Sequence, residues 1–153
     1  MCSSDLVNLA YYGRSDQHLA WRFEPDLATL ARDVDILIVA APGGRETARM
    51  IDARVLEALG PQGLLVNIAR GSLVDEEALI AALQEGRIGG AALDVFDNEP
   101  AIDARFFGLE NVLLMPHIGS ATQETRAAMA RLMLDNLRSW FRSWRVLTPV
   151  PIN

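Results

Sequence analysis

Residues 36–44 read Ile-Leu-Ile-Val-Ala-Ala-Pro-Gly-Gly, an apolar run that ends in three chain-breaking residues. The run is rich in β-branched residues and contains no polar residue, which favours a strand over a surface helix. A strand without alternating polarity is typical of a parallel sheet with both faces covered. We therefore predict a strand over Ile36–Ala41 that is buried on both faces.

Similar segments lie on both sides of this strand. Leu64–Ile68 is another apolar run and predicts a second buried strand, and shorter strands are expected at Val7–Tyr12, Gly90–Leu93 and Val112–Met115. Helices are expected over residues 25–31, 46–59 (with Asp52 as an internal cap), 75–86 and from about 122. Strands that alternate with helices imply right-handed crossovers. The sequence therefore predicts an α/β fold, a parallel sheet flanked by helices.

The composition limits the class of protein. The chain has 153 residues, 50% of them hydrophobic, which is enough for the core of one globular domain. Its net charge of −6 opposes binding to nucleic acid or to an anionic membrane. Its single cysteine, Cys2, cannot form an internal disulfide, no residues have the spacing of a metal site, and no apolar run approaches the roughly 20 residues of a membrane helix. We expect a cytoplasmic protein without a metal that binds a small molecule.

Polar residues follow three of the predicted strands. Arg70 follows the second apolar run, Asp94 and Glu99 follow the next strand, and His117 follows the last. In an open α/β sheet, ligands bind outside the carboxyl ends of the strands. If the three strands are parallel and adjacent, about 4.8 Å separates neighbouring strands, so these side chains can meet around one small molecule.

An arginine, a carboxylate and a histidine suit the reduction of a 2-keto acid. The planar guanidinium of arginine pairs with a carboxylate through two hydrogen bonds and polarises an adjacent carbonyl. A histidine titrates near neutrality, so it can donate a proton to the forming alkoxide, and a glutamate beside it stabilises the imidazolium. None of these groups donates hydride, so the chemistry requires a nicotinamide cofactor.

Three long blocks of sequence carry a family resemblance. They are Val66–Leu79 (VNIARGSLVDEEAL), Gly90–Pro100 (GAALDVFDNEP) and Met115–Thr122 (MPHIGSAT). In order and spacing they resemble the D-isomer-specific 2-hydroxyacid dehydrogenase family, and the resemblance extends from about Val7 to Pro149. Residues 42–47 (PGGRET) especially resemble the branch of glyoxylate, hydroxypyruvate and hydroxyphenylpyruvate reductases.

The resemblance implies a Rossmann-type domain and a role for each polar residue. Arg70 would bind and polarise the substrate, His117 would be the general acid and base, and Glu99 would be its partner. Asp94 would contact the nicotinamide end of the cofactor. The full set of residues expected to contact the cofactor is Gly13, Arg14, Ser15, Ala41, Pro42, Ile68, Ala69, Arg70, Asp94, His117 and Gly119. The family also implies a homodimer in the full-length enzyme.

Gly13-Arg14-Ser15 bears on the choice of cofactor. The segment ends the strand at which an acidic residue would bind the ribose 2′-hydroxyl of NAD, whereas an arginine there accommodates the 2′-phosphate of NADP. The family's NADPH-preferring members often have Ser-Arg-Ser here, from which Gly13 departs, and Asp16 lies close by. We expect NADP(H), with NAD(H) as the alternative.

Some parts of the family pattern do not occur in the sequence. No G-x-G-x-x-G precedes Val7, so the first strand and the pyrophosphate loop are expected to be missing, together with the N-terminal substrate segment. We expect an N-terminally truncated cofactor domain over residues 7–122, a C-terminal helix and tail over 123–153 that pack toward the substrate domain, and a non-native start at 1–6. The isolated chain is expected to bind cofactor weakly and to have no useful catalytic activity.

Two other functions fit the same resemblance. Formate and phosphite dehydrogenases share the architecture, although formate dehydrogenases usually have glutamine in place of Glu99. Some relatives are NAD(H)-sensing transcriptional corepressors that retain the Arg-Glu-His set and act through protein contacts. Turnover by the full-length protein would separate the reductase from the corepressor.

Overall fold

The computed structural model describes residues 7–150, so the expected non-native start at 1–6 lies outside the described residues. The chain divides after Pro116 into two compact units. The elements of the first unit are β1 (Ala10–Tyr11), β2 (Arg22–Phe23), α1 (Leu27–Asp33), β3 (Ile36–Val39), α2 (Ala53–Leu59), β4 (Leu64–Asn67), the 3₁₀ helix η2 (Gly71–Leu73), α3 (Glu76–Gln84), β5 (Gly90–Leu93), the 3₁₀ helix η3 (Ala104–Gly108) and β6 (Val112–Leu114). The second unit contains α4 (Gln123–Ser143).

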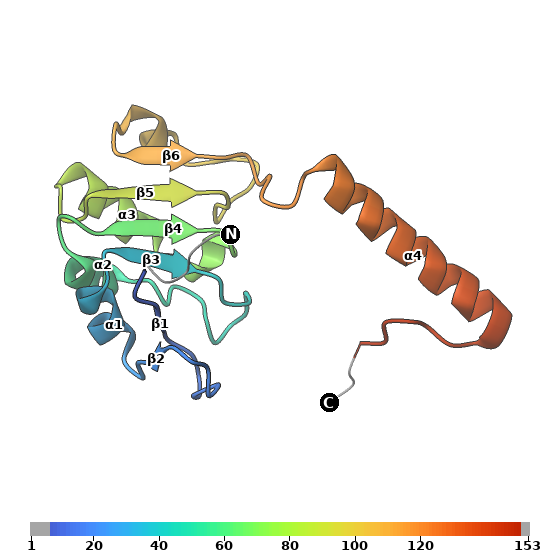
Figure 1. Ribbon diagram of the computed structural model, residues 1–153. Helices are drawn as coiled ribbons and strands as arrows, with labels where there is room; N and C mark the ends of the chain where they lie inside the picture. Colours follow the sequence, from blue (N-terminus) through green and yellow to red (C-terminus); the bar gives the residue numbers. More distant parts are fainter. Residues whose placement is uncertain (1–6, 151–153) are drawn as a thin grey trace. The chain divides into compact units, whose positions relative to one another are not determined.

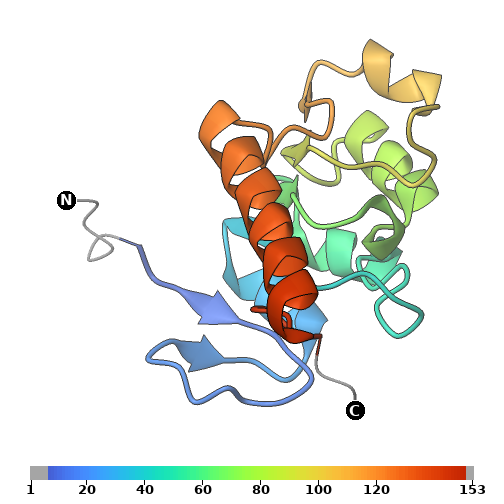
Figure 2. The ribbon, with the colours of Figure 1, turned by 90° about the vertical axis from the view of Figure 1, so that its right-hand side faces the viewer.

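A parallel sheet organises the first unit. Its four strands have the order β3-β4-β5-β6, and every neighbouring pair is parallel, so all carboxyl ends lie at one edge (Figure 1). The predicted parallel sheet is therefore confirmed, and so is the condition that the strands before Arg70, Asp94 and His117 are adjacent. β1 and β2 form a separate parallel pair and lie side by side (Figure 2). The sequence did not predict β2.

Helices α1–α3 cover one face of the sheet. The core between them contains Leu37 and Val39 of β3, Leu65 of β4 and Leu93 of β5, all at most 5% exposed. The prediction that β3 is buried on both faces is wrong, because Ile36 and Ile38 on the other face are 51% and 58% exposed. The same face of β4 carries Leu64, which is 43% exposed. Burial alternates along β3 and β4, as expected when only one face packs against helices.

The helices begin at side chains that cap them. Asp26, Asp52 and Asp75 accept hydrogen bonds from backbone N–H groups three residues later, in α1, α2 and α3. Such a cap satisfies one of the N–H groups that the first turn leaves without a partner. The three aspartates therefore fix where the helices begin.

The predicted helix over residues 46–59 is wrong in its first half. Residues 45–49 form turns, and α2 begins only at Ala53, with Asp52 as its N-cap and not inside it. Arg49 has a φ of 51°, which a helix does not accommodate. Ile51 donates its N–H to the carbonyl of Leu73 at 3.0 Å and forms a parallel bridge with Val74. This long-range pairing replaces the local helix.

The second unit contains α4, the helix predicted from about residue 122, and Thr122 caps it by accepting a hydrogen bond from Thr125 N. After the helix the tail folds back along it, because Asn136 Oδ1 accepts hydrogen bonds from the N–H groups of Leu147 and Thr148 at 2.9 and 3.1 Å. Although α4 is long, none of the helices within residues 7–150 combines the length and the apolarity needed to span a bilayer.

Candidate active site

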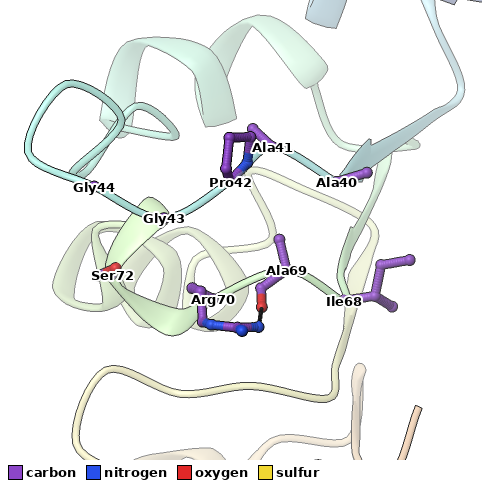
Figure 3. A pocket seen from close by; sticks show the side chains of 9 residues that line it. All are labelled: Ala40, Ala41, Pro42, Gly43, Gly44, Ile68, Ala69, Arg70 and Ser72. Atoms are coloured by element: carbon purple, nitrogen blue, oxygen red, sulfur yellow. Dashed lines mark hydrogen bonds between the residues drawn. The ribbon is translucent and has the colours of Figure 1, made fainter. Parts of the chain in front are cut away.

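A cleft of about 730 Å³ opens at the carboxyl ends of β3 and β4 (Figure 3). One wall follows β3 and the other follows β4. The lining residues are Ala40, Ala41, Pro42, Gly43, Gly44, Ile68, Ala69, Arg70 and Ser72. Five residues of the predicted site therefore share one cleft: Ala41, Pro42, Ile68, Ala69 and Arg70.

Asn67 shapes the wall that follows β4. Its side chain is buried, 1% exposed, and its Nδ2 donates to the carbonyl of Arg70 at 3.0 Å while its Oδ1 accepts from Ala69 N at 3.1 Å. A buried amide must have hydrogen-bond partners, and here the partners are the backbone of the turn that ends in Arg70. Sequence analysis missed this positioning role. Its signal was the polar residue inside an otherwise apolar strand.

The side chain of Arg70 lies at the cleft. Its Nη1 donates to the carbonyl of Ala69 at 2.6 Å, as the dashed line in Figure 3 shows, and the residue is exposed. The backbone is thus fixed by Asn67, whereas among the described residues the guanidinium is held by one local bond, to Ala69 O. A guanidinium has five N–H donors, so Arg70 can also bind an anion in the cleft.

Gly71 lets the turn after β4 pack against the loop after β5. A Cβ on Gly71 would lie 1.9 Å from the carbonyl carbon of Phe96 and 2.2 Å from Asp97 N. Both atoms belong to the backbone, so no side chain can move aside. A side chain at position 71 would clash with this backbone, so the residue after Arg70 must be glycine. The close contact joins the loop that carries Arg70 to the loop that carries Glu99.

Gly71→Ala is expected to destabilise the fold by about 1–3 kcal/mol or more, since overpacking forces backbone shifts. Thermal unfolding followed by circular dichroism measures the effect. Gly108→Ala is the matched control, because a Cβ there meets nothing within 4 Å. Equal unfolding temperatures for the two variants would contradict the assignment of Gly71 as a close-contact residue.

The loop after β5 carries Asp94 and Glu99. Asp94 is buried, 9% exposed, and its N–H donates to the carbonyl of Asn67 at 3.0 Å, which fixes it beside the end of β4. Glu99 Oε1 accepts from Phe96 N at 2.9 Å, so its carboxyl group closes a turn of its own loop. Glu76 Oε1 accepts from Asp97 N at 2.7 Å, and burial raises the pKa of the Glu76 carboxyl.

His117 and Gly119 follow β6 and belong to the second unit. His117 has a φ of 54°, a left-handed conformation that is uncommon outside glycine. Such conformations collect at functional sites, where the surrounding structure enforces them. Arg70, Asp94 and Glu99 lie in the first unit, so the convergence of Arg70, Glu99 and His117 stays a prediction.

The segment after β1 forms an ordered loop. The hydroxyl of Tyr11 donates to Asp16 Oδ1, which also accepts from His18 N at 2.8 Å. These hydrogen bonds, first that of Tyr11 and then that of His18, lower the pKa of the Asp16 carboxyl. Arg14 Nη1 lies 2.8 Å from Glu46 Oε2 in an exposed ion pair. Asp16 therefore structures the loop, and Arg14 presents its charge at the surface.

A comparison with protein families matches most of the chain. Residues 5–119 match the model of the NAD-binding domain of D-isomer specific 2-hydroxyacid dehydrogenases. The chain belongs to this family. The resemblance drawn from the three sequence blocks is thereby confirmed, and the first unit is the family's Rossmann-type cofactor domain.

Relatives of the chain include several named reductases. It is 50% identical over 141 residues to glyoxylate/hydroxypyruvate reductase A of Arabidopsis thaliana, covering 92% of this chain and 45% of the relative. It is 56% identical over 128 residues to 2-ketogluconate reductase of Gluconobacter oxydans, covering 84% of this chain and 41% of the relative. The chain thus spans less than half the length of these relatives.

A solved structure resembles the chain closely. The NADPH-dependent glyoxylate/hydroxypyruvate reductase of Sinorhizobium meliloti, in complex with NADP and malonate, superposes with a TM-score of 0.90 at 47% identity. The match covers 95% of this chain and 46% of the other. The chain therefore has the fold of the corresponding part of that structure, in which NADP is bound.

Proposed function

We propose that this dehydrogenase chain supplies the cofactor domain of an NADPH-dependent reductase for small 2-keto acids of the glyoxylate and hydroxypyruvate type. The observation that carries the proposal is the cleft at the carboxyl ends of β3 and β4, which has an exposed arginine on its wall. A guanidinium at such an edge suits a substrate that carries a carboxylate next to the reacting carbonyl.

The cleft fits a nicotinamide cofactor. Its β3 wall consists of small residues, so a ligand can approach the backbone there. Gly43 also leaves room for the side chain of Arg70, since a Cβ on Gly43 would lie 3.0 Å from Arg70 Cγ. The cofactor would supply hydride to the keto carbon of the substrate. Asp94, buried at the end of β5, is the proposed contact to its nicotinamide end.

The chain's own residues handle the carboxylate and the proton. Arg70 would pair with the substrate carboxylate and stabilise the negative charge that develops on the keto oxygen as hydride arrives. His117 would donate the proton that converts this oxygen to a hydroxyl group. Glu99, the proposed partner of His117, would stabilise the imidazolium before that transfer.

NADPH is the proposed cofactor because of Arg14 and Ser15. Arg14 offers an exposed guanidinium directly after the strand where the adenosine ribose binds in this architecture, and Ser15 adds a hydroxyl. Asp16, the acidic residue that could bind the 2′-hydroxyl of NADH, already accepts hydrogen bonds from Tyr11 and His18. This engagement favours NADP over NAD.

Arg14→Ala is expected to weaken NADPH binding about tenfold and to leave NADH binding nearly unchanged, because only NADPH carries the 2′-phosphate that the charge-assisted hydrogen bond would hold. Fluorescence titration of both cofactors into the full protein measures the two dissociation constants. A parallel loss for NADPH and NADH would refute a role of Arg14 in selecting the cofactor.

Oxidation of NADPH by the full protein, followed with glyoxylate, hydroxypyruvate and an aryl pyruvate, tests the proposed reaction directly. Turnover of formate or phosphite in their place would favour the related dehydrogenases. Cofactor binding without any turnover would favour the corepressor alternative. The proposed setting is a cytoplasmic homodimer, an expectation that follows from the family and from the single cysteine.

A further inference from the structure

Glu46 stands on the loop after β3 and contacts the proposed cofactor-selecting residue. We propose that Glu46 is a specificity-determining residue that competes with the 2′-phosphate of NADPH for the guanidinium of Arg14. The inference rests on the proposed function, in which Arg14 holds that phosphate. It adds that the carboxylate of Glu46 competes with the 2′-phosphate for Arg14 and thereby limits the preference of the protein for NADPH over NADH.

The loop that carries Glu46 is ordered by hydrogen bonds. Thr47, the next residue, donates its hydroxyl to the carbonyls of Pro42 and Gly44 at 2.9 and 3.2 Å, and its N–H also donates to Gly44 O at 3.2 Å. Pro42 and Gly44 line the cleft. Glu46 is therefore attached to a turn that is tied to the cleft wall, and not to a free end of the chain.

Arg14 likewise stands on an ordered loop. Gln17 Nε2 donates to the carbonyl and to the hydroxyl of Ser15 at 3.1 and 3.0 Å, and Tyr11 holds Asp16 from the strand side. The two loops are 32 residues apart in sequence, yet Arg14 Nη1 and Glu46 Oε2 lie 2.8 Å apart. The pair thus joins the proposed adenosine end of the site to the cleft wall.

The exposure of the pair makes it exchangeable. The side chains of Arg14 and Glu46 are 82% and 76% exposed. An exposed ion pair contributes little, because water and salt screen the charges and two long side chains must be ordered. A phosphate dianion with three acceptor oxygens can displace a carboxylate held this weakly, but it binds less tightly than it would to an unpaired guanidinium. NADH has no 2′-phosphate, so the pair does not oppose it.

Glu46→Gln in the full protein tests the competition. The dissociation constant of NADPH should fall about twofold to fivefold, the range that loss of an exposed pair allows, and that of NADH should stay constant. The gain should shrink at high salt, since exposed charges are then screened. Glu85→Gln is the matched control and should change neither dissociation constant. Glu85 also forms an ion pair, at 2.7 Å with Arg87, but the pair lies between the end of α3 and the amino end of β5, away from the carboxyl ends of the strands.

The Arg14→Ala background separates the possible failures. In that background Glu46→Gln should leave the dissociation constant of NADPH unchanged, because no guanidinium is left to compete for. A gain in NADPH affinity as large as in the protein with Arg14 would overturn the inference. Unchanged or weaker NADPH binding by the single Glu46→Gln variant would also overturn it, if Arg14→Ala alone still lowers NADPH affinity. If Arg14→Ala leaves the preference for NADPH unchanged, the proposed phosphate contact itself is refuted.

Discussion

Replacing His117 by glutamine is expected to lower kcat for 2-keto acid reduction by about 10²–10⁴-fold, the usual contribution of a general acid. Glutamine can still donate a hydrogen bond to the keto oxygen, so the Michaelis constant of the substrate should change little. It cannot give up a proton, so the alkoxide that forms on hydride arrival has no adjacent acid. Steady-state kinetics of the full protein with NADPH and glyoxylate measure both constants.

Thermal unfolding followed by circular dichroism serves as the control for this variant, because His117 is exposed and its replacement should leave the unfolding temperature unchanged. Glu99→Gln should reduce kcat in the same direction but less, since it removes the stabilisation of the imidazolium and leaves the acid in place. A large rise in the Michaelis constant of His117→Gln with kcat unchanged would instead assign His117 a binding role only.

The parallel sheet could be predicted because its cause is local in sequence. The apolar runs before Pro42 and Arg70 alternate with segments that carry helix caps, and this alternation leaves few topologies. The exposure of Ile36 and Ile38 could not be predicted in the same way. An apolar run shows that a strand can be covered on both faces, but whether a second layer covers it depends on which other segments are present.

The boundaries that failed depend on long-range contacts. Residues 46–52 have acceptable helix propensity, but long-range pairing, which includes the bridge between Ile51 and Val74 and the bond from Arg49 N to Ser72 O, keeps them out of a helix. β2 is two residues long and exists through its pairing with β1, so it has no periodicity of its own. Local pattern therefore located the elements, whereas pairing across the chain decided where two of them begin.

The candidate site divides along the same line. Arg70 and Asp94 could be placed at strand ends because the carboxyl ends of parallel strands share one edge. The role of Asn67 in positioning Arg70 could not be predicted. It depends on the hydrogen bonds of Asn67 to the carbonyl of Arg70 and to Ala69 N, and the spacing of residues in the sequence does not indicate these bonds. The ion pair of Arg14 and Glu46 could not be predicted from a sequence motif either, since the two residues come from different loops.

Arg70→Met is expected to lower kcat/KM for a 2-keto acid on the order of 10²–10³-fold, the loss seen when one donor to a developing oxyanion is removed. Both constants should respond, because the guanidinium would bind the carboxylate in the ground state and stabilise charge in the transition state. The fold should not respond. Asn67 holds the backbone at Arg70, and within residues 7–150 the guanidinium donates only to the neighbouring carbonyl of Ala69.

Two comparisons isolate the role of the guanidinium of Arg70. Arg70→Lys should recover only part of the loss, because an ammonium keeps the charge but not the planar fork that binds a carboxylate through two bonds. Arg54→Met removes an exposed arginine of α2 that pairs with Asp26 at 3.1 Å, and it should leave kcat/KM unchanged. An Arg70→Met protein that reduced glyoxylate as efficiently as the unmodified protein would exclude the cleft between β3 and β4 as the place where the substrate carboxylate binds, and the substrate would then have to be held by residues outside this edge of the sheet.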